Sequence, residues 1–218
     1  MLFTNGERVE ADVVLCNTGF VRDWSYLSGV VPSAAAFTET RTLFKHMVDP
    51  DIGPSLSFVG WARPAEGGVP AIAEIQARYL ALLLSGERVL PTDCRAQTRR
   101  DKLADEARFY IVPHMDSLVH YSLFMEELAE LVGCKANLGA MFFTNNAMWR
   151  RLWFGSHLAA VYRLRGPGAT PGVATETLQR LPVAWFANPL ATRIARQLTF
   201  VCVVSFLCTP FGFLESSW

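Results

Sequence analysis

The stretch Leu56-Ser57-Phe58-Val59-Gly60 opens the part of the sequence that decides the fold. Its short apolar run predicts a buried strand, and the glycine-rich residues 61–69 after it predict a loop. Pro70 then begins a predicted helix that runs to about Ser85 and ends at Gly86, because proline suits the first helical turn and glycine often follows the last. A strand, a loop and a helix in this order are typical of an α/β fold.

The predicted helix carries two further patterns. Glu74 and Arg78 are four residues apart, the spacing of a helical ion pair. An apolar stripe predicts the face that packs against the core. Its members are Ile72, Ile75, Tyr79, Leu82 and Leu83.

Three more helices are predicted towards the C-terminus, at residues 95–110, at 123–132 with Gly133 as the stop, and at 146–154. Residues 166–172 are rich in glycine and proline and predict a loop. The charged Glu126, Glu127 and Glu130 predict the wet face of the second of these helices, and Trp149, Trp153 and Phe154 predict core contacts.

The N-terminus begins with a hairpin pattern. Residues 2–4 and 8–10 flank Asn5-Gly6, which favours a type I′ turn. Residues 12–16 are an apolar run that suits a strand buried on both faces. Such a strand needs partners, so we expect that residues upstream of Met1 have been lost. Residues 1–20 contain four charged side chains and therefore no signal-peptide core.

Composition narrows the possible functions. Hydrophobic residues make up 51% of the chain, charged residues 18%, and the formal net charge is zero without a basic run, which argues against a nucleic-acid partner. The five cysteines form no C-x-x-C pair, and the four histidines have no i,i+4 spacing, so no metal site is predicted. No G-x-S-x-G elbow of a hydrolase occurs.

Four motifs in order resemble the flavin-containing monooxygenase family. The first runs from Asp12 to Phe20 and resembles the Ala-Thr-Gly-Tyr segment of that family, with Asn17 in place of alanine. Phe58-Val59-Gly60, with Pro70 and Glu74-Ile75-Gln76-Ala77-Arg78 after it, resembles the family's Phe-Ile-Gly strand and Glu-Leu-Gln-Ala-Arg helix. Residues 125–138 resemble its Glu-Leu-Ala helix, and residues 162–168 its Tyr-Arg-Leu-x-Gly-Pro-Gly segment.

This resemblance implies an α/β fold: an incomplete FAD/NAD(P)-binding Rossmann-type domain with helical C-terminal additions and a hydrophobic C-terminal tail. The implied domains are residues 1–92 as the end of the dinucleotide-binding core, 93–185 as the helical region, and 186–218 as the tail. The family's G-x-G-x-x-G fingerprints for FAD and NADPH are absent from these residues. Gly166-Pro167-Gly168 does not replace them, because it is interrupted by Pro167 and Pro171, follows no clear strand and opens no predicted helix.

The resemblance also implies a function. Family members use NADPH and FAD to oxygenate soft nucleophiles, such as an amine nitrogen or a sulfide, with O₂ and through a flavin C4a-hydroperoxide. The residues expected beside the cofactor are Thr18, Gly19, Gly60, Trp61, Gly68, Val69, Pro70 and Ala71. The start of the predicted helix would turn unpaired N–H groups towards the flavin. A cofactor contact from Gln76 or Arg78 is a further alternative, and no catalytic acid, base or nucleophile is identified.

Other interpretations stay open at this stage. A strand, a loop and a helix of this kind are more often plain α/β packing than a cofactor site. Without the two glycine fingerprints the chain alone is expected to be inactive. An alternative function is therefore that of a catalytically inactive, membrane-attached remnant or a partner-binding module. Another two-nucleotide flavoprotein oxidoreductase would share the Thr-Gly segment but not the Glu-x-Gln-Ala-Arg helix.

The tail adds a prediction of membrane attachment. Residues 198–214 contain no charge and are about the minimum length for crossing a bilayer. Arg193 and Arg196 precede the run and Trp218 follows it, as interfacial residues do. Family members with similar tails are held on the cytoplasmic face of the endoplasmic reticulum. The alternative is a buried terminal helix in a cytoplasmic protein.

Overall fold

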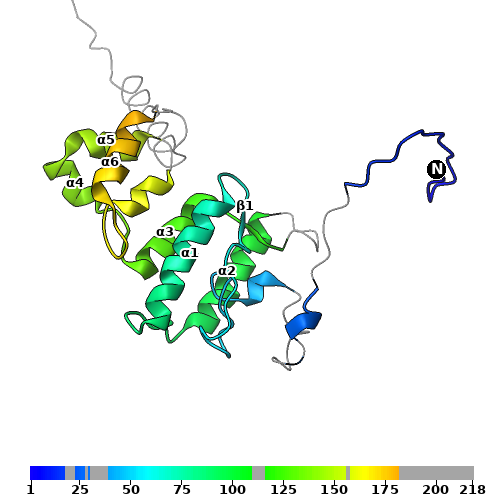
Figure 1. Ribbon diagram of the computed structural model, residues 1–218, viewed down its shortest axis with the longest axis horizontal. Coiled ribbons are helices and arrows are strands. Elements are labelled where there is room, and N and C mark those ends of the chain that lie inside the picture. The colour runs from blue at the N-terminus through cyan, green and yellow to red at the C-terminus, as the bar shows by residue number, and fades with distance from the viewer. Residues whose placement is uncertain (18–22, 28, 30–38, 110–115, 156–157, 182–218) are drawn as a thin grey trace, which may run out of the picture. The chain divides into compact units, whose positions relative to one another are not determined.

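A computed structural model describes residues 1–17, 23–27, 29, 39–109, 116–155 and 158–181 (Figure 1). The chain divides into two compact units, Met1–Glu39 and Thr40–Trp218. The first unit is small and contains a hairpin and the 3-10 helix η1 (Ser25–Leu27). The second unit holds all the α-helices and the short strands of the described residues.

The predicted N-terminal hairpin is present, with a different turn. Leu2 and Arg8 form an antiparallel bridge, and the Gly6 N–H donates to the Phe3 carbonyl at 2.9 Å. Gly6 has a φ of 87°, whereas Asn5 is not among the described residues with positive φ. A type I′ turn needs positive φ at both positions, so the loop is instead three residues long with glycine in the left-handed place.

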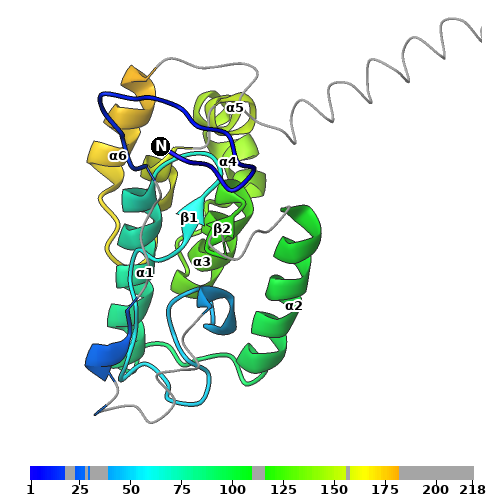
Figure 2. The same ribbon diagram turned by 90° about the vertical axis from the view of Figure 1, so that its right-hand side faces the viewer.

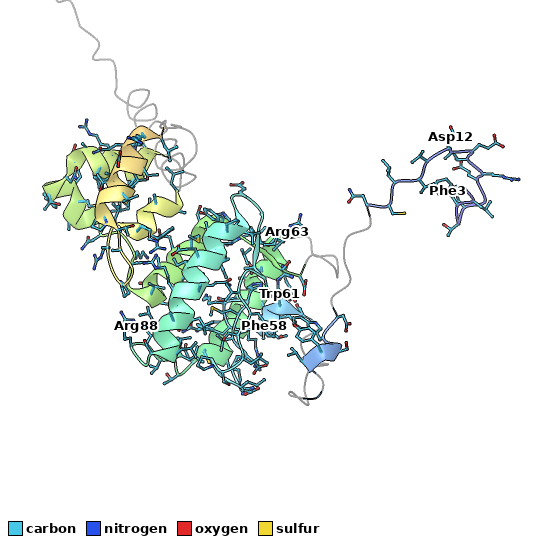
Figure 3. All side chains as sticks on the ribbon, viewed as in Figure 1. Phe3, Asp12, Phe58, Trp61, Arg63 and Arg88 are labelled. Carbon is cyan, nitrogen blue, oxygen red and sulfur yellow. The ribbon has the colours of Figure 1, made fainter. Side chains whose placement is uncertain are left out.

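The prediction of a buried strand at residues 12–16 is wrong. Val13 is 74% exposed and Leu15 is 90% exposed, and neither lies in a strand. A strand buried on both faces needs hydrogen-bonded neighbours and covering helices. No strand among the described residues pairs with this segment. Figure 3 labels Phe3 and Asp12 in this N-terminal segment, which is drawn as irregular chain after the hairpin.

Two helices form the main core of the second unit. Helix α1 (Val69–Leu84) begins and ends within one residue of the prediction, and all five members of its predicted stripe are buried. It packs against α3 (Tyr121–Val132), and the two run side by side in Figures 1 and 2. Gly133, with a φ of 83°, ends α3 as the sequence predicts. Helix α2 (Cys94–Arg108) contacts the 3-10 helix η3 (Thr40–Thr42).

The sheet is much smaller than expected. Strand β1 (Arg63–Pro64) pairs in parallel with β2 (Leu118–Val119), and each has two residues. The predicted strand at residues 56–60 is wrong, because only Ser57 forms a bridge there, to Val48. Phe58 is nevertheless buried, and its N–H donates to Met47. This mixed arrangement of helices and a small sheet is consistent with part of an FAD-binding type of domain.

The C-terminal part of the described residues is helical. Helix α5 (Asn146–Phe154) has the predicted bounds, while α4 (Leu138–Thr144) and α6 (Pro171–Arg180) were not predicted. The 3-10 helix η5 (Ala159–Arg163) lies against α6, and a small core joins them. That core consists of Met148, Val161 and Leu178.

The apolar run at residues 198–214 lies outside the described residues. Among the residues that are described, no helix is long and apolar enough to cross a membrane. The expected tail is therefore not tested by the structure.

Candidate functional site

The beginning of α1 is an open helix end. Gly68 is the N-cap with φ −121° and ψ 133°, and no side chain caps the helix there. Pro70 has no N–H to satisfy, and the Ala71 N–H donates to the Gly68 carbonyl at 3.2 Å. Val69 is 38% exposed. The helix end therefore keeps unpaired N–H groups and a positive dipole that no side chain of the described residues caps.

The two glycines before α1 differ in backbone conformation and in the space available for a Cβ atom. Gly67 has a φ of 88°, and a Cβ built on it would lie 3.0 Å from the ring of Tyr121. At Gly68 the φ is one that any residue adopts, and a Cβ would meet only Pro70 Cδ, at 3.5 Å. The protein's own packing explains glycine at position 67 and does not explain it at position 68.

Gly60 and Trp61 lie in the loop that precedes β1. Gly60 has a φ of 84°, and its N–H donates to Gln76 Oε1 at 2.9 Å. Trp61 packs edge-on against Phe58, with ring centroids 6.2 Å apart, and the two are neighbours in Figure 3. The Gly60 N–H is thus already used inside the protein, and the loop is tied to the middle of α1.

Gln76 is fully buried and joins two loops. Its Oε1 accepts from Gly60, and its Nε2 donates to the Lys45 carbonyl at 2.9 Å. Both ends of the amide therefore have protein partners. This supports a scaffolding role for Gln76 over the alternative of a cofactor contact.

Lys45 is a buried cation that the sequence did not reveal. Its Nζ lies 2.7 Å from Asp101 and 2.6 Å from Glu127, and only 5% of its side chain is exposed. Burial acts to lower the pKa of Lys45, but hydrogen bonds to the two carboxylates outweigh burial and raise it. Lys45 and His46 also have positive φ, 49° and 54°. A lysine within the apolar run of residues 43–48 was the available signal.

Arg78 links α1 to the segment around η5. Its Nη1 donates to the Tyr162 carbonyl at 3.0 Å and its Nη2 to the Pro167 carbonyl at 2.5 Å. The predicted ion pair with Glu74 is confirmed at 3.7 Å, although Glu74 lies closer to Arg163, at 2.6 Å. These contacts favour a packing role for Arg78 as well.

The Tyr-Arg-Leu-x-Gly-Pro-Gly segment is held by similar contacts. The Tyr162 hydroxyl donates to Glu126 at 3.0 Å, and burial raises the pKa of this tyrosine. Gly166 has a φ of 81°, and a Cβ there would lie 2.5 Å from the Gly133 carbonyl oxygen. The segment therefore needs glycine for close packing against the end of α3.

The prediction that three carboxylates form the solvent-facing side of α3 is confirmed, since none of them is buried, and the structure adds their partners. Glu127 pairs with Lys45, and Glu126 accepts from Tyr162 and lies 3.6 Å from Lys135. Only Glu130 is mainly exposed, at 73% of its side chain. Two of the three carboxylates thus serve contacts between elements.

The structure places four of the eight predicted cofactor residues at the start of α1 and two more in the loop before β1, where Gly60 is hydrogen-bonded to Gln76. These six are Gly60, Trp61, Gly68, Val69, Pro70 and Ala71. Thr18 and Gly19 lie outside the described residues. In the described part of the chain, no three His, Cys, Asp or Glu side chains are placed to hold a metal ion.

Comparison with known proteins gives the class to which this fold and site belong. The flavin-binding monooxygenase-like family matches residues 1–214, so the chain belongs to that family. A 4-hydroxybenzoate brominase (decarboxylating) from Pseudoalteromonas luteoviolacea is 37% identical over 185 residues, which cover 84% of this chain and 34% of that protein. Flavin-containing monooxygenase 5 from Cavia porcellus is 31% identical over 179 residues, covering 78% of this chain and 32% of that protein. The chain thus spans 34% and 32% of the length of these two relatives.

Proposed function

We propose that the chain supplies the C-terminal part of an FAD- and NADPH-dependent monooxygenase, and that the start of α1 forms one wall of its flavin site. The observation that carries this proposal is Gly68. Nothing in the protein's own packing requires glycine there, while a ligand approaching the backbone would. Membership of the flavin-binding monooxygenase-like family supports the same reading.

Each residue of the site has a separate task in this proposal. Gly68 and Val69 offer backbone N–H groups where negative charge would be stabilised at little reorganisation cost. Pro70 fixes the first helical turn, and Gln76 holds the loop of Gly60 and Trp61 in place. Bound FAD would accept hydride from NADPH and use O₂ to oxygenate a nucleophilic amine nitrogen or sulfide.

A second candidate reaction is bromination of a hydroxybenzoate. Its support is that the relative named as a brominase is more similar to the chain than the relative named as a monooxygenase, at 37% against 31% identity. For either reaction we place the flavin at the start of α1. A further alternative is an inactive module that binds a partner, for which the start of α1 would have no ligand.

The test uses a chimera in which this chain replaces the matching third of the Pseudoalteromonas protein. Gly68→Leu should lower the flavin absorbance per protein at least tenfold, because the side chain would occupy the space of the ring. Gly172→Leu is the matched control, since Gly172 has open space around it on α6. Unchanged flavin occupancy in Gly68→Leu would remove the site from this helix.

The same chimera separates the candidate activities. Oxygenation of amines and sulfides by NADPH and O₂ supports the first candidate, and bromination of 4-hydroxybenzoate supports the second. The 218-residue chain expressed alone should stay colourless and should not oxidise NADPH, because it contains neither glycine fingerprint. Stoichiometric flavin in that preparation would contradict the assignment.

We also propose that residues 198–214 attach the protein to a membrane, on the cytoplasmic face of the endoplasmic reticulum. A central Arg or Lys costs about 2.5–3.5 kcal/mol on insertion scales. Val204→Arg should therefore move the protein out of the carbonate-washed membrane pellet, and deletion after Gln197 should do so more completely. If the unmodified chain washes off as readily as the deletion, the run is not an anchor and the cytoplasmic alternative holds.

A further inference from the structure

A cluster of five aromatic side chains lies on α4 and α5, away from the proposed flavin site. Trp149 is its centre, with ring centroids 4.9 Å from Phe142, 5.6 Å from Trp153 and 6.1 Å from Phe154. Phe142 in turn contacts Phe143 at 5.0 Å. The sequence predicted core contacts for the tryptophans, and this is only half right, because α5 buries Met148 fully and its aromatic residues partly.

Two of the aromatic side chains in this cluster are exposed to solvent, although their rings are apolar. Phe143 is 86% exposed and Phe142 is 45% exposed. A single exposed apolar side chain needs no explanation, but a connected group of phenylalanine and tryptophan rings marks an interaction surface. The small core of this region is completed by Met148, Val161 and Leu178 without these rings.

The same surface is positively charged, which favours an anionic partner. Residues 138–155 contain Arg150 and Arg151 and no acidic residue. Both arginines line a shallow pocket together with Trp149 and Phe154, and neither makes an ion pair within the described residues. Aromatic rings beside cations, without carboxylates, are the composition that favours the interface of a membrane with anionic lipids.

We propose that the surface formed by the aromatic cluster with Arg150 and Arg151 docks on an anionic lipid membrane. The rings of Phe142 and Phe143 enter the headgroup region, and the arginines lie against lipid phosphates. This contact is separate from the tail. Residues 198–214 carry no charge, so their insertion needs no anionic lipid, whereas docking by this surface does.

The experiment is co-flotation of the whole chain with vesicles of phosphatidylcholine alone, or of phosphatidylcholine with phosphatidylglycerol. Binding to the neutral vesicles measures the tail. The part of the gain with phosphatidylglycerol that is lost in Arg150→Glu measures the surface, because Arg193 and Arg196 beside the tail also attract anionic lipid. Arg150→Glu should reduce that gain about 25-fold, because it removes one cation and adds one anion near a charged surface, and high salt should abolish it. Phe143→Asp should reduce it as well, without changing thermal unfolding.

Matched variants on α2 give the controls. Arg99→Glu makes the same charge change at another exposed arginine, and Leu103→Asp makes the same apolar-to-acidic change at a leucine that is 60% exposed. Both should leave the gain unchanged. Equal binding to the two kinds of vesicle, or equal losses in the α5 and α2 variants, would overturn the proposal. Loss of single-stranded oligonucleotide binding in Arg150→Glu, with vesicle binding intact, would overturn it in favour of nucleic acid.

Discussion

The first turn of α1 and the two turns that follow it differ in how their polar groups are used. Gly68 is half-buried and Val69 is 38% exposed, and no side chain caps the helix there. At Gln76 and Arg78 each polar side chain reaches across to other segments of the second unit. One continuous motif therefore combines an open half, which we assign to a ligand, with a closed half that holds the surrounding loops.

This difference shows why the motif alone could not assign roles. Glutamine and arginine in a helix beside a predicted cofactor are natural candidates for ligand contacts. The structure gives both of them internal partners, and the ligand side that we propose consists of backbone atoms that carry no side-chain signature. Substitutions in the closed half and in the open half therefore test separate contributions to the free energy of unfolding.

The largest expected effect is in the closed half. Gln76→Leu keeps the bulk of the side chain but leaves the Gly60 N–H and the Lys45 carbonyl without their partner. Each polar group left unpaired in a buried place costs about 1–3 kcal/mol, so we expect a loss of about 2–4 kcal/mol in the free energy of unfolding. Urea denaturation followed by circular dichroism measures this loss.

Gln97→Leu is the control for that prediction. Gln97 also donates a hydrogen bond, to Asp93 at 2.7 Å, but on the surface of α2. Its replacement should change stability by less than about 0.5 kcal/mol. Similar losses in both variants would show that the closed half is no more tightly held than the surface.

Lys45 gives the second test of the closed half. Lys45→Met keeps most of the stem and removes the two ion pairs. Because Asp101 and Glu127 are 41% and 50% exposed and stay hydrated, we expect a loss of about 1–3 kcal/mol, below that of a fully buried pair. Lys102→Met, which removes a longer pair of 3.9 Å to Glu106, should change stability little.

The same substitution has a pH dependence with a definite sign. The pKa of Lys45 is raised in the folded protein above its unfolded value. Its stabilisation is therefore complete below the unfolded pKa and is lost as pH rises through the folded pKa. The difference between the wild type and Lys45→Met should be constant at neutral pH and shrink only in strongly alkaline solution. A difference that shrinks towards acidic pH, with no alkaline change, would assign the effect to the carboxylates.

The helices of the core could be predicted from the sequence because their signals are local. Pro70, Gly86 and Gly133 mark helix ends, and the apolar stripe of α1 has the helical period. The strands could not be predicted in the same way. Residues 12–16 and 56–60 have the apolar pattern of strands, yet pairing depends on neighbours that the pattern does not contain.

The internal supports of the proposed site could not be predicted from the sequence. The resemblance pointed to Gly60 and Gly68 as cofactor residues, which stays a prediction, while the roles of Lys45 and Tyr162 depend on contacts across more than thirty residues of chain. Helices α4 and α6 were missed because their signals, Asn137 as a cap and Pro171 in the first turn, lie in segments that otherwise look like loops. Long-range partners and short helices were thus the two sources of error.

The smallest effects are expected at Gly67 and Gly68, the two glycines at the start of the open half, and their contrast is the most direct test of the comparison. Gly67→Ala forces a left-handed residue and a contact of 3.0 Å with the Tyr121 ring, so it should cost about 1–2 kcal/mol. Gly68→Ala meets neither obstacle and should change the free energy of unfolding by less than about 0.5 kcal/mol. Thermal unfolding of the two variants measures both effects on the chain itself. If Gly68→Ala is as damaging as Gly67→Ala, position 68 is glycine for the protein's own packing, and the argument for a ligand at the start of α1 loses its basis.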